Sequence, residues 1–180
     1  APKTPGTAFG DVKPGSFYEQ AVAWAVENGI TSGTGEGMFS PDATCTRAQS
    51  VTFLYRASGS PAVSDKAEFS DVSTTAFYAD AVAWAAKKGI TTGIGGGLFG
   101  SGNDCTRAQI VTFLYRAMGT APTTVNGFTD VAAGDFYAEA VAWAVENGVT
   151  SGTSASAFSP NAGCTRTQIV TFLYRAYQGK

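Results

Sequence analysis

The segment CTRAQSVTFLYRA, residues 45–57, occurs three times in the chain with few changes. It returns as CTRAQIVTFLYRA from Cys105 and as CTRTQIVTFLYRA from Cys164. All six arginines of the 180-residue chain lie inside these segments, at Arg47, Arg56, Arg107, Arg116, Arg166 and Arg175. The chain is therefore three copies of one unit, and this segment is the least altered part of each copy.

Each copy of the segment has the pattern of a helix with a defined start. A threonine precedes the apolar run and a glutamine follows that threonine by three residues, which is the capping box of a helix N-terminus. The pairs are Thr46 and Gln49, Thr106 and Gln109, and Thr165 and Gln168. The cysteine before each threonine falls at N′. In the second and third repeats it can pack on the isoleucine at N4, Ile110 or Ile169, whereas the first repeat has Ser50 at that position.

The two arginines of each segment differ in their relation to the helix dipole. Those in the last turn, where a cation is favoured, are Arg56, Arg116 and Arg175. Those at the first helical position, where a cation opposes the dipole by about 0.3–1 kcal/mol, are Arg47, Arg107 and Arg166. A cation beside free N-terminal amides is half of an anion site. The alternative is a solvated arginine, or one paired with a neighbouring carboxylate.

Composition restricts the function classes. A net charge of −2 and a pI near 5.0, with no basic patch beyond the scattered arginine pairs, argue against a nucleic-acid partner. No apolar run approaches the length of a membrane span. There is no histidine, so we expect no metal site, and nothing in the sequence indicates a cofactor. Without an initiator methionine or a signal peptide, the chain is expected to be a mature or excised fragment.

The three cysteines do not form an even disulfide set, because there is one in each repeat. We interpret each as a small buried hydrophobic residue at the helix start. The alternative is a reactive thiol, since Arg47 lies two positions after Cys45 and a cation favours the thiolate.

A second helix is expected earlier in each repeat, over residues 17–28 in the first. Ser16 and Glu19 have the spacing of another capping box, and Phe17, Ala21 and Trp24 follow one apolar stripe. A helix that is apolar over most of its circumference belongs inside, so we expect these three helices to form a central bundle. Their tryptophans are then core residues rather than sugar-stacking ones: Trp24, Trp84 and Trp143.

A glycine-rich loop joins the two helices of each repeat. Phe39, Phe99 and Phe158 are expected to anchor these loops on the core. The glycines permit positive φ and let a ligand approach the backbone, although a turn-rich connector is the alternative for any one of them. The loops are not phosphate loops, because no Lys-Ser/Thr pair follows them.

Three units are expected at residues 1–60, 61–120 and 121–180, joined by connections that contain Pro61 and Pro122. Corresponding residues are displaced by 60 and then by 59 positions. One helical hairpin cannot bury its apolar face alone, so the three units must share a core. The sequence therefore predicts an all-α fold of three helix-loop-helix repeats, a compact monomer with pseudo-threefold symmetry.

Taken in order, the phrases FxDV, FYxxAVAWAxxxGITxG and FxPxxxxTRAQxVTFLYRA resemble the S-layer homology (SLH) repeat, three times over nearly the whole chain. The resemblance implies a pseudo-trimer shaped as a three-pronged spindle around a central three-helix bundle. It implies a non-enzymatic anchor at the bacterial cell surface. The family's usual ligand is a secondary cell-wall polymer attached to peptidoglycan, often with pyruvylated sugars, which is bound in grooves between adjacent repeats.

The resemblance also implies the ligand-binding residues. The basic residue of the family's TRAE motif maps to Arg47, Arg107 and Arg166. The aspartate of the opening phrase maps to Asp11, Asp71 and Asp130, and the glycine of ITxG to Gly33, Gly93 and Gly152. We expect each arginine to pair with a ligand carboxylate, assisted by backbone amides at the helix start. We expect each aspartate to accept sugar hydroxyls, and the alternative is that it caps a short turn.

The chain departs from the family pattern at three places. Glutamine replaces the TRAE glutamate in every copy, which keeps the capping bond and indicates a structural role. Cysteine stands where the family often has an aliphatic residue. The second repeat has Ser101 in place of proline, followed by Gly102 and Asn103, so its groove is expected to differ.

Two other function classes compete with a wall anchor. One is a protein-interaction or structural spacer module with no carbohydrate ligand. The other is an enzyme such as a glycoside hydrolase, which needs a pair of carboxylates. The acidic residues of this chain recur with the repeats, and catalytic sites are seldom triplicated, so we expect no catalysis.

Overall fold

The computed structural model describes residues 9–66 and 68–178, and this part of the chain is helical, with six α-helices and no strand. The helices are α1 (Glu19–Glu27), α2 (Arg47–Ala57), α3 (Ala79–Lys87), α4 (Arg107–Met118), α5 (Ala138–Glu146) and α6 (Arg166–Gln178). The expected all-α class is confirmed. None of these helices combines the length and the apolar character that a membrane crossing requires.

The capping boxes predicted for the second helix of each repeat are present. At the start of α2, Gln49 N donates to Thr46 Oγ1 at 3.2 Å and Thr46 N donates to Gln49 Oε1 at 3.0 Å. The same pair of bonds begins α4 and α6. The box predicted at Ser16 is wrong, because Glu19 instead accepts from Gly15 N at 2.7 Å and α1 begins only at Glu19.

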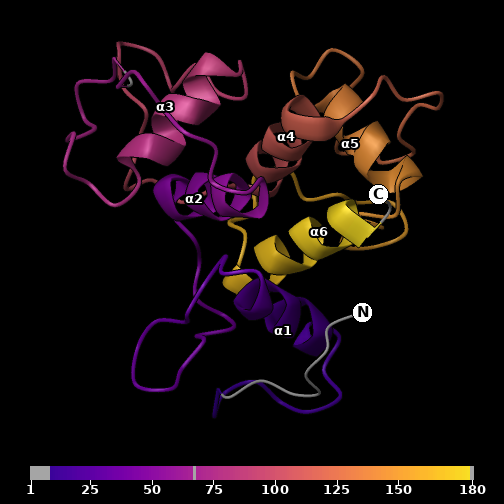
Figure 1. Ribbon diagram of the computed structural model, residues 1–180. Helices are drawn as coiled ribbons and strands as arrows, with labels where there is room; N and C mark the ends of the chain where they lie inside the picture. Colours follow the sequence, from indigo (N-terminus) through magenta and orange to yellow (C-terminus); the bar gives the residue numbers. More distant parts are fainter. Residues whose placement is uncertain (1–8, 67, 179–180) are drawn as a thin grey trace.

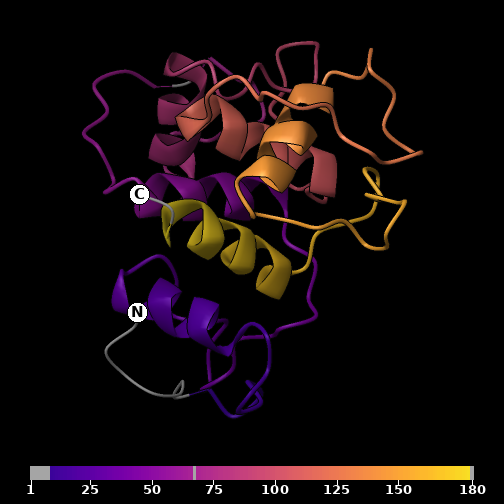
Figure 2. The ribbon, with the colours of Figure 1, turned by 90° about the vertical axis from the view of Figure 1, so that its right-hand side faces the viewer.

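The helices pair across repeats rather than within them. The close pairs are α2 with α3, α4 with α5, and α6 with α1, so the last repeat returns to the first. Figure 1 shows α1, α3 and α5 at three corners, with α2, α4 and α6 between them, and Figure 2 shows α6 lying against α1 from another side. The helices that contact one another at the centre are α2, α4 and α6.

The expectation that the first helices of the repeats form the central bundle is therefore wrong. The stripe of α1 is buried, with Ala21, Val22 and Ala25 at most 1% exposed, but the helix that α1 packs on is α6 of the last repeat. The other face of α1 is wet, since Val26 is 41% exposed. Apolar periodicity correctly predicted burial, and it did not specify the partner helix.

Backbone hydrogen bonds between the three cysteines join the repeats at the centre of the molecule. Cys45 N donates to Cys164 O at 3.0 Å, Cys105 N to Cys45 O at 2.9 Å, and Cys164 N to Cys105 O at 2.8 Å. All three side chains are buried and unbridged. Burial raises the pKa of Cys45 to about 12 and that of Cys105 to about 11, so both thiols stay protonated at neutral pH. The interpretation of the cysteines as buried structural residues is confirmed.

The tryptophans lie at the interfaces between paired helices, as expected for core residues. Trp84 packs on Tyr55 with ring centroids 5.6 Å apart, which joins α3 to α2. Trp143 packs on Tyr115 in the same way, and Trp24 packs on Tyr174 of α6. Each loop is anchored by a fully buried phenylalanine, as predicted: Phe39, Phe99 and Phe158.

Candidate functional site

The arginine at the start of each inner helix is buried, with 3–4% of its surface exposed. Its Nε donates to the carbonyl of the loop phenylalanine in the following repeat. The bonds run from Arg47 to Phe99 O at 3.0 Å, from Arg107 to Phe158 O at 2.8 Å, and from Arg166 to Phe39 O at 2.7 Å. Each of these arginines therefore joins two repeats, and Arg166 joins the last repeat to the first.

Each buried guanidinium also lies between two aromatic rings. The Cζ of Arg107 is 4.8 Å from the ring centroid of Phe158 and 5.3 Å from that of Phe172. Arg47 and Arg166 have the same arrangement with their own pairs of rings. A cation in this position is stabilised by the ring quadrupoles. The stack fixes the plane of the guanidinium and explains how the charge is held away from water.

The backbone amides beside these arginines are not free. Arg47 N donates to Asn103 O at 2.8 Å, and Ala48 N to Ser101 O at 3.3 Å. The third amide, that of Gln49, is taken by the threonine cap. The expectation that helix-start amides assist a bound anion is therefore wrong, because carbonyls of the neighbouring repeat occupy them. Those carbonyls also offset the unfavourable field that a cation meets at this end of a helix.

No carboxylate of the described residues forms an ion pair with these arginines, although an opening aspartate near each of them favours its charged form. The ion pairs found there are Lys66 with Asp80 and Lys87 with Asp65, and no arginine takes part. Burial lowers the pKa of Arg47, Arg107 and Arg166, but arginine stays charged in proteins. Each buried site therefore holds a positive charge whose nearest bonded partners are neutral.

The opening aspartates are bound by the loops of their own repeats. The Asp71 carboxylate accepts from Phe99 N and Gly100 N, each at 2.7 Å, and from Ser101 N at 3.3 Å. Asp11 and Asp130 accept from two loop amides each. Burial alone would raise the pKa of Asp71, but these bonds outweigh it and the pKa lies below its ordinary value. This is the geometry of the turn cap, and a role of the aspartates toward sugar stays a prediction.

The ITxG glycines occupy backbone positions that only glycine fits. Gly33, Gly93 and Gly152 have φ of 89°, 82° and 87°. A Cβ at Gly93 would collide with the Leu98 carbonyl and the Phe69 ring. Their conformation is explained by the turn itself, although Gly93 and Gly152 also line grooves.

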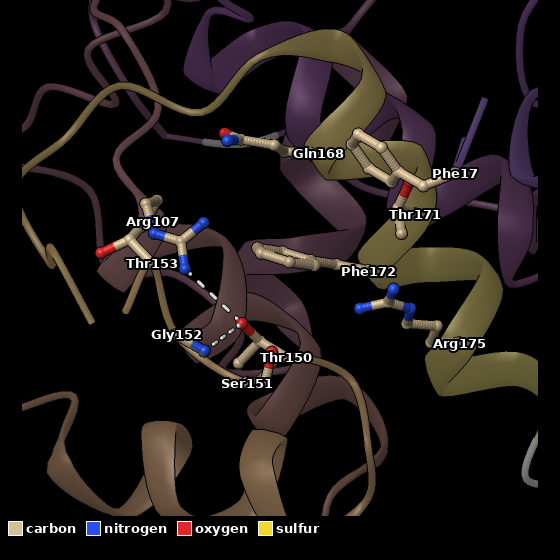
Figure 3. A pocket seen from close by; sticks show the side chains of 10 residues that line it. All are labelled: Phe17, Arg107, Thr150, Ser151, Gly152, Thr153, Gln168, Thr171, Phe172 and Arg175. Carbon is tan, nitrogen blue, oxygen red and sulfur yellow. Dashed lines mark hydrogen bonds between the residues drawn. The ribbon is translucent and has the colours of Figure 1, made fainter. Parts of the chain in front are cut away.

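Two grooves contain a buried arginine together with a last-turn arginine. The Arg107 groove has a volume of about 320 Å³ and is lined in part by Phe17, Arg107, Gly152, Gln168, Phe172 and Arg175. The Arg47 groove has a volume of about 380 Å³ and is lined in part by Arg47, Gly93, Gln109, Phe113, Arg116 and Phe136. In Figure 3 the two arginines of the Arg107 groove point toward its middle from opposite sides of Phe172.

Two of the buried arginines have Nη2 donors that the described residues satisfy weakly or not at all. Arg107 Nη2 donates to Thr150 Oγ1 at 3.5 Å, a long contact. Arg47 Nη2 is buried without a hydrogen-bond partner among the described residues. A buried donor left unpaired costs about 1–3 kcal/mol.

Sequence reasoning missed two contributors to the grooves. The last-turn arginines were expected only to complement the helix dipole, yet Arg116 and Arg175 are exposed and line the grooves. Nη1 of Arg116 donates to Ile90 O, and Nη1 of Arg175 donates to Val149 O. Phe17 was assigned to the core stripe, but it precedes α1 and is 70% exposed. The recurrence of both residue types in all three repeats was the available signal.

Comparison with known proteins gives one family. The model of the S-layer homology domain matches residues 8–49, 68–111 and 127–169. A cell surface protein of Thermoanaerobacter kivui is 36% identical over 118 residues, which is 63% of this chain and 16% of that protein. An S-layer protein of Bacillus thuringiensis subsp. finitimus is 28% identical over 174 residues, which is 93% of this chain and 21% of that protein. The chain thus aligns with a small part of each of these relatives.

Proposed function

The chain belongs to the S-layer homology family, and on that premise we propose that it anchors a surface protein noncovalently to the bacterial cell wall. The ligand is an anionic secondary cell-wall polysaccharide linked to peptidoglycan, bound in the grooves between repeats. The names of the relatives, a cell surface protein and an S-layer protein, support a location at the cell surface.

The observation that carries this proposal is the pair of guanidinium groups in each groove. Arg107 and Arg175 line one groove and Arg47 and Arg116 the other. None of the four is ion-paired with a carboxylate of the described residues. Charge-assisted hydrogen bonds contribute roughly 1.5–3 kcal/mol each. Two such groups converging on one cavity favour a carboxylate that bridges them.

A pyruvylated sugar meets these requirements. Its ketal carboxylate is a planar anion that a guanidinium fork can bind through two parallel hydrogen bonds. The last-turn arginine is the accessible partner because it is exposed, and the buried arginine forms the floor of the groove. The Asp carboxylates are occupied by loop amides, so the specificity toward sugar hydroxyls that we propose for them acts through their second lone pairs.

The arginine pair recurs in all three repeats and lines two grooves on one body, which suits a repeating polymer. The units 1–60, 61–120 and 121–180 act together as one monomeric module in this proposal, because every helix pair joins two of them. Simultaneous engagement of several weak sites raises the affinity by on the order of 10²–10⁴ over one site. The spindle outline with three prongs remains part of this proposal.

The module is proposed to have no catalytic role. Its groove residues recur in each repeat, and the opening aspartates accept hydrogen bonds from backbone amides that hold them ionised, which does not suit a general acid. Any activity of the parent protein would then lie outside the residues considered in this proposal.

The test uses cell-wall sacculi of the source bacterium before and after chemical removal of the attached polymer. The wild-type chain should sediment with intact sacculi and remain in solution with stripped ones. The triple variant Arg56→Ala, Arg116→Ala, Arg175→Ala should lose binding at least tenfold, whereas Lys66→Ala, a cation outside both grooves, should not. Equal binding to stripped sacculi would favour the protein-interaction or spacer module instead.

A further inference from the structure

Three phenylalanines stand exposed in equivalent positions. Phe17, Phe77 and Phe136 are 70%, 67% and 68% exposed. Each lies edge-on to the tyrosine that follows it, with ring centroids 5.1, 5.0 and 5.0 Å apart and interplanar angles of 85–88°. The contact with tyrosine restrains each ring, so the exposed face is presented in a fixed direction. So much exposed apolar surface contributes little to folding.

Two of these rings line the arginine grooves, and each of the two comes from a different repeat than the rest of its groove. Phe17 lines the Arg107 groove because α1 packs on α6, and Phe136 lines the Arg47 groove because α5 packs on α4. Figure 3 shows Phe17 beside Thr171 and Phe172 of α6, on the same side of the groove as Gln168. Phe77 precedes α3, which packs on α2 in the same relation.

We propose that Phe17, Phe77 and Phe136 are aromatic walls on which a pyranose ring of the ligand stacks. This inference rests on the proposed function, since it concerns the same grooves. The C–H groups on one face of a pyranose form an apolar surface, and an aromatic face attracts such a surface by dispersion and by its quadrupole. The arginines bind the acidic substituent while the phenylalanine contacts the ring that carries it.

The proposal specifies the ligand class more narrowly than charge does. A linear polyol phosphate polymer offers anions to the arginines but no ring to the phenylalanines. An acidic substituent on a six-membered sugar engages both. The grooves are therefore selective for cyclic acidic sugars over linear anionic polymers of equal charge.

The proposal also makes each groove the product of all three repeats. In the Arg107 groove the second repeat supplies Arg107, the third supplies Gln168, Phe172 and Arg175, and the first supplies Phe17. Arg47, Arg116 and Phe136 play the same parts in the Arg47 groove, with the repeats permuted. Two repeats alone would lack the buried arginine, the last-turn arginine or the aromatic wall of any given groove.

The first test compares Phe17→Ala, Phe77→Ala, Phe136→Ala with the wild type in the full chain. The probes are a methyl pyranoside bearing a 4,6-pyruvate ketal and poly(glycerol phosphate). The triple variant should bind the pyranoside about tenfold more weakly and the linear polymer unchanged. Tyrosine at the three positions should restore binding, and leucine should not. Val125→Ala, at a position 92% exposed and outside both grooves, is the matched control.

The second test is spectroscopic. Stacking on an aromatic face shifts the ring protons of the bound pyranoside upfield in NMR spectra, and the shift should vanish in the leucine variant. A purely structural role for the phenylalanines would leave these shifts in place.

The third test uses pairs of variants. Phe17→Ala with Arg175→Ala alters one groove, whereas Phe17→Ala with Arg116→Ala alters two. The losses in pyranoside affinity should be coupled in the first pair and additive in the second. Unchanged pyranoside binding in the triple alanine variant, with binding lost in the triple last-turn arginine variant, would overturn the aromatic wall alone. Unchanged binding in the arginine variant, or none by the wild type, would overturn the proposed function and this inference together.

Discussion

Each inner helix carries one arginine at each end, and the two lie in opposite environments. At the start of α4, Arg107 is 3% exposed, lies between two phenylalanine rings and donates to a carbonyl of the next repeat. At the end of the same helix, Arg116 is exposed and donates to a carbonyl of its own repeat. Arg107 therefore lies between two repeats, whereas Arg116 lies at the rim of a groove. Both side chains nevertheless line grooves.

The two arginines of one sequence motif therefore have different roles, one in stability and one in binding. Nε of the buried arginine donates to a carbonyl of the next repeat, and both faces of its guanidinium contact phenylalanine rings. Only the terminal nitrogens then remain for a ligand. The exposed arginine uses one terminal nitrogen in a 3.1 Å hydrogen bond, and the rest of its guanidinium stays accessible. We therefore expect substitutions at the two positions to have separable effects on stability and on binding.

The largest expected effect is on stability. Arg107→Ala removes a charge-assisted hydrogen bond and the contacts with two rings, and it leaves Phe158 O unpaired in a buried site. We expect a loss of about 2–4 kcal/mol in the free energy of unfolding. For a chain of this size that corresponds to a fall of roughly 4–16 °C in Tm, measured by circular dichroism.

The matched control for this prediction is Arg175→Ala, at an exposed position with one 3.3 Å bond. It should change stability by less than about 1 kcal/mol. Equal melting curves for the two variants would show that the buried arginine is not a structural link between repeats.

The next effect separates the two arginines by salt. Raising sodium chloride from about 50 to 500 mM shortens the Debye length about threefold, and it should weaken pyranoside binding roughly tenfold because the rim cation is exposed. Thermal stability should change little over the same range, since the buried guanidinium is shielded from salt and its hydrogen bond and ring contacts are short-range. Binding by calorimetry and unfolding by circular dichroism, in the same buffers, give the comparison. Parallel loss of both would contradict the separation of roles.

Much of this arrangement was predictable from the sequence because it depends on local patterns. The capping box of Thr46 and Gln49, the burial of Phe39 and the core position of Trp84 all follow from spacing along one segment. The family resemblance likewise located the buried arginines before their geometry was known, because the motif recurs three times.

The failures concern contacts between repeats. The stripe of α1 predicted burial correctly, but nothing local says that α1 packs on α6, because that pairing depends on how three repeats close around one centre. Phe17 was read at helical spacing with Ala21, yet the helix begins only at Glu19, so the period did not apply to Phe17. The hydrogen bond from Arg47 Nε to the carbonyl of Phe99, 52 residues away, was not predicted either.

A smaller effect concerns pH and the aspartates that clamp the loops. The pKa of Asp11, Asp71 and Asp130 lies below its ordinary value, because the folded loops donate amides to the carboxylates. The resulting stabilisation is complete above the unfolded-state pKa of about 3.9 and is lost as the pH falls through the lower folded-state values. Tm should therefore fall on acidification below about pH 4. The triple Asp→Asn variant should lose this dependence, and an equally steep acid transition in that variant would contradict the assignment.

The smallest expected effect comes from restoring the glutamate that the family motif has at Gln168. Gln168→Glu keeps an oxygen that accepts from Thr165 N, so the capping box survives, and an acid in the first turn should add about 0.3–1 kcal/mol of stability. The same change adds a negative charge to the groove that Arg107 and Arg175 line. Repulsion of about 1 kcal/mol between this carboxylate and the anionic group of the ligand would weaken pyranoside binding roughly fivefold. Gln20→Glu, at an exposed first-turn position of α1 outside both described grooves, is the control for a general charge effect. Tighter binding in Gln168→Glu would mean that the groove takes its ligand through hydroxyl donors rather than through an anion.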